Sequence, residues 1–291
     1  MDHEIGRVAV NRVAVNRAIE LCLAGDISPL VAISRMLLGG MDAAAIGAAV
    51  ADARSPAPAW QALATLLDER GDALAALAAE IRTTGGDHTA IGGVAEVAAF
   101  FDHAVEHSPE AGVALHSLGD PALLALATNE IVTWIVAEGL LPPGASVLDF
   151  GCGFGRIAAA LAPRCGSVLG VDVSPGMVAQ ARRRHGATAG LRFITTDGST
   201  VPPGPFDLAL LVDCMPYILQ AGLAEPTMAA VRSSLRPGGA IAVLNLSYGG
   251  DDAADARDAA RWAATHGLDL AISRPFDIWD GTAFVFRSVS R

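Results

Sequence analysis

Apolar residues recur with two different periods along this chain of 291 residues. Over residues 1–90 they recur at the three- and four-residue spacing of amphipathic helices, as at Leu74, Leu77 and Ile81. Further along, short apolar runs alternate with segments of helical periodicity. We therefore expect an all-α domain over residues 1–90 and an α/β domain over residues 91–291.

The first domain contains helix start and stop signals but no catalytic constellation. Ser28 is a predicted N-cap with Pro29 at the first helical position, and Gly39 and Gly40 end that helix. The polar stretch 83–87 is predicted to be a linker. We expect these helices to pack together, to form a homodimer or to act as a lid, rather than to bind substrate.

The second domain is predicted to contain a parallel sheet that closes with an antiparallel hairpin. The predicted strands lie near residues 146–150, 168–172, 191–195, 207–212, 240–246, 268–273 and 282–289. The predicted helices between them lie near residues 155–163, 175–185, 225–235 and 252–266. Residues 91–141 are expected to add helices before the first strand.

Three glycines, Gly151, Gly153 and Gly155, follow the first predicted strand and precede a helix. Such a turn exposes backbone N–H groups to the polar part of a ligand. A dinucleotide site requires Gly-x-Gly-x-x-Gly, whereas Arg156 stands where its third glycine would be. Asp149, at the end of the strand, suits a ligand with an ammonium group better than one with phosphates.

Further acidic residues end the next three predicted strands: Asp172, Asp197 and Asp213. Asp172 follows Asp149 at close to the interval at which an acid on a second strand meets ribose hydroxyls. An Asp at such a position can also cap the following helix. Acids at the ends of four strands favour a binding crevice at the carboxyl edge of the sheet over four separate caps.

Composition excludes several kinds of chemistry. All 20 basic residues are arginines, which excludes pyridoxal-phosphate Schiff bases, Walker-A nucleotidases and lysine nucleophiles. A net charge of −11 argues against a nucleic-acid substrate. The four cysteines form no CxxC pair and no spacing typical of zinc, so they are expected to be buried structural thiols.

Hydropathy and the first residues bear on the cellular compartment. No apolar stretch approaches the length of a membrane-spanning helix, so no membrane partner is expected. The acidic start at Met1 and Asp2 lacks the apolar region of a signal peptide, and we expect a cytoplasmic protein.

In these motifs the chain resembles the class I S-adenosylmethionine-dependent methyltransferases, most strongly over residues 145–246. The segments similar to the family's motifs are Val147–Arg156 (motif I), Gly170–Asp172 (ribose), Thr196–Gly198 (adenine), Phe206–Ile218 (motif IV) and Leu235–Gly239 (the turn before the fifth strand). The resemblance implies a Rossmann-like, seven-stranded sheet with helices on both faces. It also implies S-adenosylmethionine as cofactor and S-adenosylhomocysteine as product.

The resemblance assigns residues to each part of this cofactor. Those implied to surround the methionine are Asp149, Gly151, Gly153, Gly155, Val212 and Asp213. Asp172 is implied to hold the ribose hydroxyls. Those implied to lie at the adenine are Val173, Met177, Asp197 and Gly198.

Methyl transfer needs chiefly an acceptor held in line with the methyl group and shielded from bulk water. The residues considered as a general base are His116, Asp213, Tyr217 and His266. Of these, His116 and Tyr217 are the candidates for catalysis, and Tyr217 is expected to line the pocket. His266 ends a helix, where it is expected to complement the helix dipole.

A metal-independent enzyme is predicted. His103 and His107 have the spacing of two metal ligands on a helix but lack a recognisable third, so a solvated face is expected. The acceptor is expected to be a small molecule, in secondary or quinone-like metabolism. Two alternatives stay open: a protein methyltransferase whose substrate docks on the helical domain, and a cofactor-binding protein with other chemistry or a regulatory role.

Overall fold

The computed structural model describes residues 19–20, 22–23, 29, 32–33, 36, 41, 43–53, 58, 60–69, 93–107, 121–198, 200–247, 252–273, 276, 279 and 281–288. The described residues of the N-terminal part are mainly helical: they include α3 (Ala43–Ala53) and a helical stretch over residues 60–69. The predicted linker over residues 83–87 lies outside the described residues. Among the residues described, no helix has both the length and the apolar character needed to cross a bilayer.

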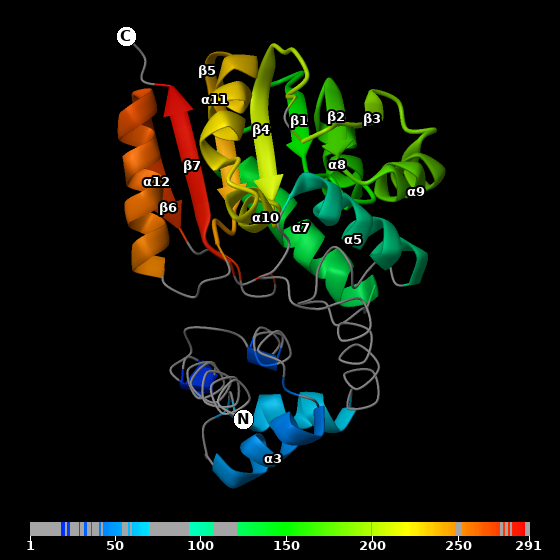
Figure 1. The fold of residues 1–291 in the computed structure, drawn as a ribbon, viewed down its shortest axis with the longest axis vertical. Coiled ribbons are helices and arrows are strands. Elements are labelled where there is room, and N and C mark those ends of the chain that lie inside the picture. Colours follow the sequence, from blue (N-terminus) through cyan, green and yellow to red (C-terminus); the bar gives the residue numbers. More distant parts are fainter. Residues whose placement is uncertain are drawn as a thin grey trace.

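A seven-stranded sheet forms the centre of the second part (Figure 1). Its strands are β1 (Ser146–Phe150), β2 (Ser167–Asp172), β3 (Leu191–Thr195), β4 (Phe206–Val212), β5 (Leu235–Leu244), β6 (Leu268–Ser273) and β7 (Ala283–Ser288). They lie in the order β3-β2-β1-β4-β5-β7-β6. The first five pair in parallel, and β7 is antiparallel to both β5 and β6. The predicted Rossmann-like sheet is therefore confirmed.

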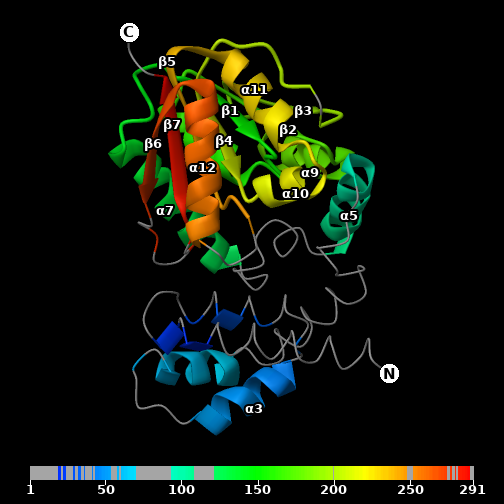
Figure 2. The same ribbon diagram turned by 60° about the vertical axis from the view of Figure 1, so that its left-hand side comes forward.

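Helices cover both faces of the sheet, as the resemblance implies (Figure 2). The helices on one face are α7 (Pro121–Ala137), α8 (Arg156–Leu161) and α9 (Pro175–His185), with the short 3-10 helix η2 (Ala162–Arg164) after α8. Those on the other face are α10 (Met215–Gln220), α11 (Ala224–Ser234) and α12 (Asp252–His266). The remaining described helix, α5 (Val94–His107), packs against α9.

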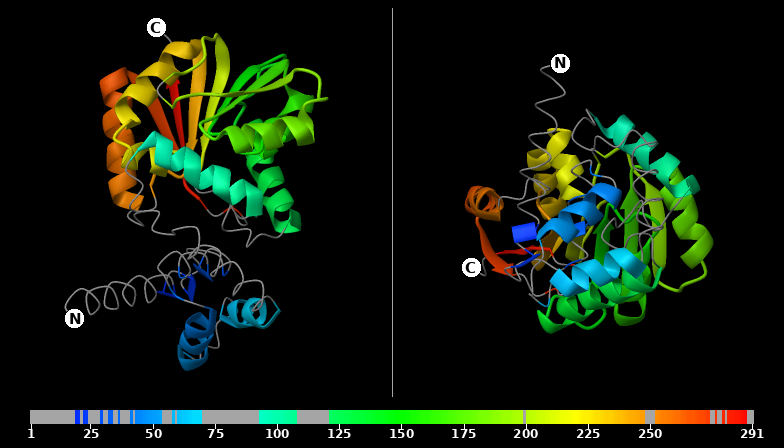
Figure 3. Two further views of the ribbon diagram at one scale, coloured as in Figure 1. Left: turned by 45° about the vertical axis from the view of Figure 1, so that its right-hand side comes forward. Right: turned by 90° about the horizontal axis from the view of Figure 1, so that it is seen from below.

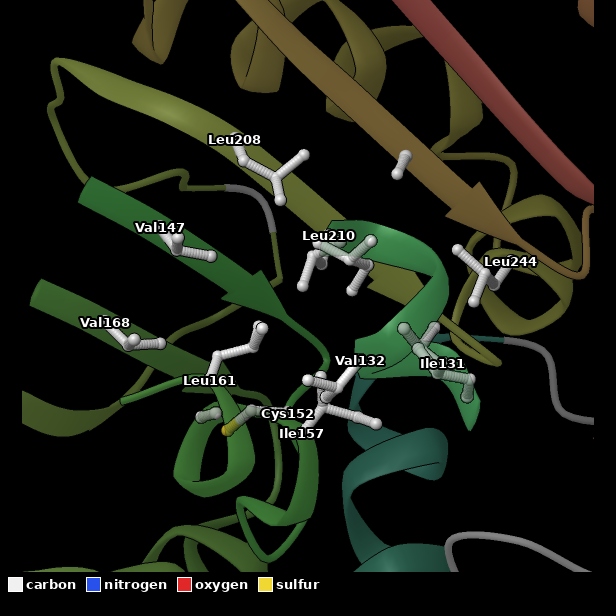
Figure 4. Packing of buried hydrophobic residues seen from close by; sticks show 14 of the residues in the cluster. Ile131, Val132, Val147, Cys152, Ile157, Leu161, Val168, Leu208, Leu210 and Leu244 are labelled. Atoms are coloured by element: carbon white, nitrogen blue, oxygen red, sulfur yellow. The ribbon is translucent and has the colours of Figure 1, made fainter. Parts of the chain in front are cut away.

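Alternate residues of the central strands enter two separate hydrophobic cores. Val147 and Leu210 pack with Ile131 of α7 and Leu161 of α8 (Figure 4). Their neighbours along the strands, such as Leu148, enter the core under α11 and α12 instead. Both faces are buried, which is why these strands read as nearly continuous apolar runs.

One strand boundary and one short helix differ from the sequence prediction. β5 begins at Leu235 rather than near residue 240, because Leu235 pairs with Phe206 before the register shifts at the Pro-Gly-Gly turn. The helix α10, directly after β4, was not predicted, because its six residues are too few for a helical period to show.

Candidate functional site

The three glycines form a tight turn between β1 and α8. Gly151, Gly153 and Gly155 have φ angles of 75°, 52° and 83°, the left-handed region that favours glycine. A Cβ built on Gly151 would lie 2.5 Å from the Cβ of Cys214, and one on Gly155 would lie 2.5 Å from the ring of Phe193. Side chains are therefore excluded at both positions. The turn is held by its own N–H groups: those of Gly151 and Cys152 donate to the Val171 carbonyl, and that of Gly155 donates to the Cys152 carbonyl.

Asp149 brings a buried carboxyl group beside this turn. The residue is 2% exposed, and Oδ2 accepts a hydrogen bond of 3.1 Å from the backbone N–H of Ala158, in the first turn of α8. Burial raises the pKa of Asp149 to about 7, although the Arg156 guanidinium opposes this rise. A bound cation would restore the charged form, so this carboxyl fits a ligand with an ammonium group.

Asp172, at the end of β2, ties the second strand to the glycine turn. Its Oδ2 accepts from the N–H of Gly153 at 2.8 Å, and its Oδ1 accepts from the N–H of Ser174 at 2.9 Å. Burial raises its pKa, and these backbone donors oppose the rise. Each carboxylate oxygen can accept a further hydrogen bond, so the geometry leaves room for the predicted contacts to ribose hydroxyls.

The residues predicted to lie at the adenine occupy three different environments. Gly198 lies against Val173 and Val94 of α5. Met177 is completely buried, in a cluster with Val105, Leu124 and Phe154.

Asp197 is the exposed member of this predicted group. Its Oδ1 accepts a hydrogen bond of 3.0 Å from the N–H of Thr200. This contact holds the carboxylate on the loop after β3. A hydrogen bond from the adenine amine to this carboxylate stays a prediction.

Helix α5 crosses the carboxyl edge of the sheet, where β1, β2 and β4 end (Figure 3). Asp102 fixes it to the start of α9, because its Oδ1 accepts from Ser174 Oγ at 2.6 Å and from the Gly176 N–H at 2.8 Å. Phe101 meets the ring of Tyr217 on α10 edge to face, with centroids 5.2 Å apart. The helix thus covers the edge at which the glycine turn lies. Asp102 was missed in the sequence because it carries no local motif.

Val212 ends β4, which lies next to β1 in the sheet, and Asp213 follows it. Val212 is buried. Asp213 has a φ of 57°, and its carboxylate accepts from Asn245 Nδ2 at 2.6 Å and from Trp279 Nε1 at 3.1 Å. Arg156 Nη2 lies 3.7 Å from Asp213 Oδ2. The sequence could not show these partners, because Asn245 and Trp279 are distant along the chain.

The candidate bases that the structure describes lie on different elements. His116 lies outside the described residues. Tyr217 is half-buried on α10, beside the carboxyl edge. His266 pairs with Glu225 at 3.0 Å, between α12 and α11, which gives it a role in joining two helices.

The described residues support neither a metal site nor a reactive cysteine thiol. In the ranges given above, no three metal-ligating side chains gather, and His103 is exposed. Cys152 lies within the glycine turn and Cys214 packs against Gly151, but burial raises the pKa of both thiols well above the ordinary value. Both are therefore neutral at physiological pH and unsuited to nucleophilic attack.

These features fit S-adenosylmethionine, whose methionine part carries an ammonium and a carboxylate and whose sulfonium is a second cation. The turn has no room for a Cβ at Gly151 or Gly155, and the carboxyls of Asp149 and Asp172 are buried beside it. The residues that would hold the cofactor are therefore those of the glycine turn with these two acids.

Residues 147–239 match the family model described as "Methyltransferase domain". The ribosomal protein L11 methyltransferase of Paraburkholderia xenovorans is 32% identical over 157 residues, which cover 52% of this chain and 46% of that protein. The enzyme of the same name from Burkholderia cenocepacia is also 32% identical, over 162 residues. The chain thus spans about half the length of the curated relatives it matches.

Two solved structures share the fold. The magnesium protoporphyrin IX methyltransferase of Synechocystis PCC 6803, with bound S-adenosylmethionine, has a TM-score of 0.51 at 18% identity, over 67% of this chain and 97% of that one. The complex of DhpI with SAM and HEP has a TM-score of 0.53 at 14% identity, over 68% of this chain and 98% of that one. Residues 147–239 thus match a methyltransferase domain, and the strand order and the solved structures give this part of the chain the fold of S-adenosylmethionine-dependent methyltransferases.

Proposed function

We propose that this protein transfers the methyl group of S-adenosylmethionine to a small-molecule acceptor, without a metal ion. The observation that carries the proposal is the buried carboxyl of Asp149 beside a glycine turn that helix α5 covers. A covered, acidic site suits a small cationic cofactor and excludes bulk water from the reacting atoms.

In this proposal the chain's own residues bind the cofactor and orient it toward the acceptor. Asp149 and the turn from Gly151 to Gly155 hold the methionine part, and Asp172 holds the ribose. Val173, Met177 and Gly198 shape the adenine side, where Asp197 accepts from the amine. The cofactor, when bound, supplies an activated methyl group on a sulfonium. Catalysis then depends on placing the acceptor in line with that group, about 3 Å away.

The acceptor side of the proposed site is aromatic. Phe100, Phe101 and Tyr217 are half-buried, and their rings pack edge to face, with centroid distances of 5.1 Å for the two phenylalanines and 5.2 Å for Phe101 and Tyr217. Such rings favour a flat, apolar acceptor, such as a quinone-like or other secondary metabolite. Tyr217 is proposed to line this side; His116 remains the other candidate for a base.

A protein acceptor is the second candidate, because the curated relatives are named for methylation of a ribosomal protein. A net charge of −11 suits a basic protein partner. The covered carboxyl edge favours the small molecule, since a protein side chain would have to pass α5.

A methyl-transfer assay separates these candidates. The purified protein, with S-adenosylmethionine tritiated at the methyl group, would be tested against small-molecule extracts and against size-fractionated lysate protein. We expect label in low-molecular-weight products. Label in protein alone would overturn the small-molecule proposal. If the protein binds the cofactor but labels neither fraction, a binding or regulatory role would be favoured.

A further inference from the structure

Exposed positive charge gathers at one end of the sheet, on α9 and the neighbouring strand β3. Residues 173–196 contain four arginines and no acidic residue, in a chain with 31 acidic residues and a net charge of −11. The four are Arg182, Arg183 and Arg184, in the last turn of α9, and Arg192 on β3. All four are exposed, and we call this group the basic edge.

A contact between α9 and β3 joins these arginines in one surface. Arg182 Nε and Nη2 donate to the Phe193 carbonyl oxygen at 3.1 and 2.7 Å, so this guanidinium lies beside the residue that follows Arg192. The strand β3 comes first in the order of the sheet, and β6 comes last. The basic edge therefore lies at the end of the sheet opposite β6 and α12 (Figure 1).

An exposed apolar side chain lies next to Arg192. Arg192 and Ile194 are two residues apart on β3, so they point to the same face of the sheet. Phe193, between them, points the other way, into the core that α9 shares. Ile194 is 37% exposed. The surface therefore combines positive charge with a place for one apolar side chain.

Structural roles account for part of this charge. Cations in the last turn of α9 complement the helix dipole, and Arg184 lies over the ring of Phe154, 4.4 Å from its centre. Arg183 donates to Gln180 of its own helix, a contact that joins no separate elements. Arg192 is on a strand, so the helix dipole does not explain it. Its charge extends the basic surface from the helix onto the sheet.

The charge pattern favours one kind of partner. A second copy that docked through the same surface about a two-fold axis would bring the arginines of both copies together, which repulsion disfavours. A nucleic acid would need exposed aromatic rings for its bases, whereas the phenylalanine of these two elements, Phe193, is buried. Salt screens charges beyond about 8 Å, so a partner on this surface would meet the arginines rather than the net charge of the chain.

We propose that the basic edge binds an acidic segment of a partner protein, with an apolar side chain of that segment against Ile194. Arg192 lies near the start of β3, whereas the glycine turn lies at the carboxyl ends of the strands. The binding surface is therefore separate from the methyl-transfer site, and the inference does not depend on the proposed function.

The experiment measures binding of an acidic peptide to the full chain. Fluorescence anisotropy gives the Kd of a labelled, glutamate-rich peptide that contains leucine. Arg183→Gln with Arg192→Gln should raise this Kd at least about fivefold, because the pair of substitutions removes two exposed ion pairs with the peptide. Binding to the wild-type chain should also weaken about tenfold from low to physiological salt. Both positions are exposed, so this variant should keep the wild-type free energy of unfolding.

The matched control removes the same charge at the other end of the sheet. Arg257 and Arg261 are exposed arginines of α12, and Arg257→Gln with Arg261→Gln should leave the Kd of the peptide within about twofold. Ile194→Ala should weaken binding about threefold, from the lost apolar contact. A peptide with glutamine in place of glutamate should bind the wild-type chain at least about tenfold more weakly.

The possible outcomes distinguish the partners. A Kd that the paired substitution of Arg183 and Arg192 leaves unchanged, equal binding of the glutamine peptide, or no binding of the acidic peptide at low salt would overturn the proposal. Tighter binding of an oligouridylate than of the acidic peptide would assign the surface to a nucleic acid instead. Self-association of the wild-type chain that the same variant abolishes, measured by sedimentation, would assign it to a second copy.

Discussion

The carboxyl ends of β1 and β2 hold their acids differently from the end of β4. Asp149 and Asp172 accept hydrogen bonds from backbone N–H groups of the glycine turn and its neighbours. Asp213 instead accepts from the side chains of Asn245 and Trp279. The first arrangement leaves oxygen lone pairs for a ligand, whereas the second uses a carboxylate to join distant segments. We therefore expect Asp149 and Asp172 to bind the cofactor and Asp213 to organise the chain around the end of β4.

The glycine turn should show the largest effect. Gly151→Ala places a Cβ against Cys214 at a left-handed φ, so we expect a loss of about 3 kcal/mol in the free energy of unfolding. Cofactor binding should be lost with it. Chemical denaturation and calorimetry measure both.

Gly222→Ala is the matched control for this variant. Gly222 has a φ of 70°, but a Cβ there would meet nothing within 4 Å. Gly222→Ala should lower the free energy of unfolding by about 1 kcal/mol, from backbone strain alone. If Gly151→Ala and Gly222→Ala lowered the free energy of unfolding equally, close packing would not be what requires glycine in the turn.

Asp172→Asn should weaken cofactor affinity at least about tenfold, since it removes charge-assisted bonds inside a buried site. Asp207 provides a comparison, because its carboxylate also accepts from a backbone N–H, that of Ser146, but at the opposite end of the sheet. Asp207→Asn should lower stability and leave the Kd unchanged. Unchanged calorimetric affinity in Asp172→Asn would refute the ribose assignment.

Cofactor affinity should depend on pH through Asp149. Its pKa is raised from 3.8 to about 7, so the free site is largely protonated at pH 6 and must release a proton to bind an ammonium. Affinity should fall about tenfold from pH 8 to pH 6. Asp149→Asn should bind more weakly and lose this dependence; a wild-type profile that is flat over this range would contradict the assignment.

Stability should change with pH in the opposite direction. Between pH 4 and pH 7 the folded state keeps the Asp149 proton that the unfolded chain has released. The contribution of this group to the free energy of unfolding therefore falls as pH rises through this window and levels off above about pH 7. Wild-type and Asp149→Asn chains, denatured in parallel across the window, isolate the contribution.

Tyr217 should have a smaller effect, on the acceptor alone. With an acceptor in hand, Tyr217→Ala should raise its KM severalfold and leave the cofactor Kd unchanged, because the ring packs on Phe101 beside the carboxyl edge. Tyr217→Phe should keep kcat within about threefold. A loss of kcat in Tyr217→Phe of more than about a hundredfold would instead make the hydroxyl a catalytic group.

Removal of the helical domain should have the smallest effect on the cofactor. Residues 91–291 alone should bind S-adenosylmethionine within about threefold of the full chain, as expected of a domain with its own core. A folded fragment that does not bind would show that residues 1–90 complete the pocket. Light scattering of both chains tests whether the domain forms a homodimer.

Local patterns predicted most of the sheet and the glycine turn at which the candidate site lies. The strands near Asp149, Asp172 and Asp213 were predicted within a few residues, because apolar runs and the glycines are local signals. The start of β5 was wrong because a turn interrupts its pairing at Gly238 and Gly239. The contacts of Asp102 and Arg156 could not be predicted, since each joins segments that only the fold brings together.

The central claim is that the glycine turn and its two buried acids bind S-adenosylmethionine. Titration calorimetry of the folded, full-length chain with this cofactor at pH 8 tests it most directly. We predict one molecule bound per chain, with S-adenosylhomocysteine competing for the same site. Folded protein that takes up neither compound at millimolar concentration would contradict the account.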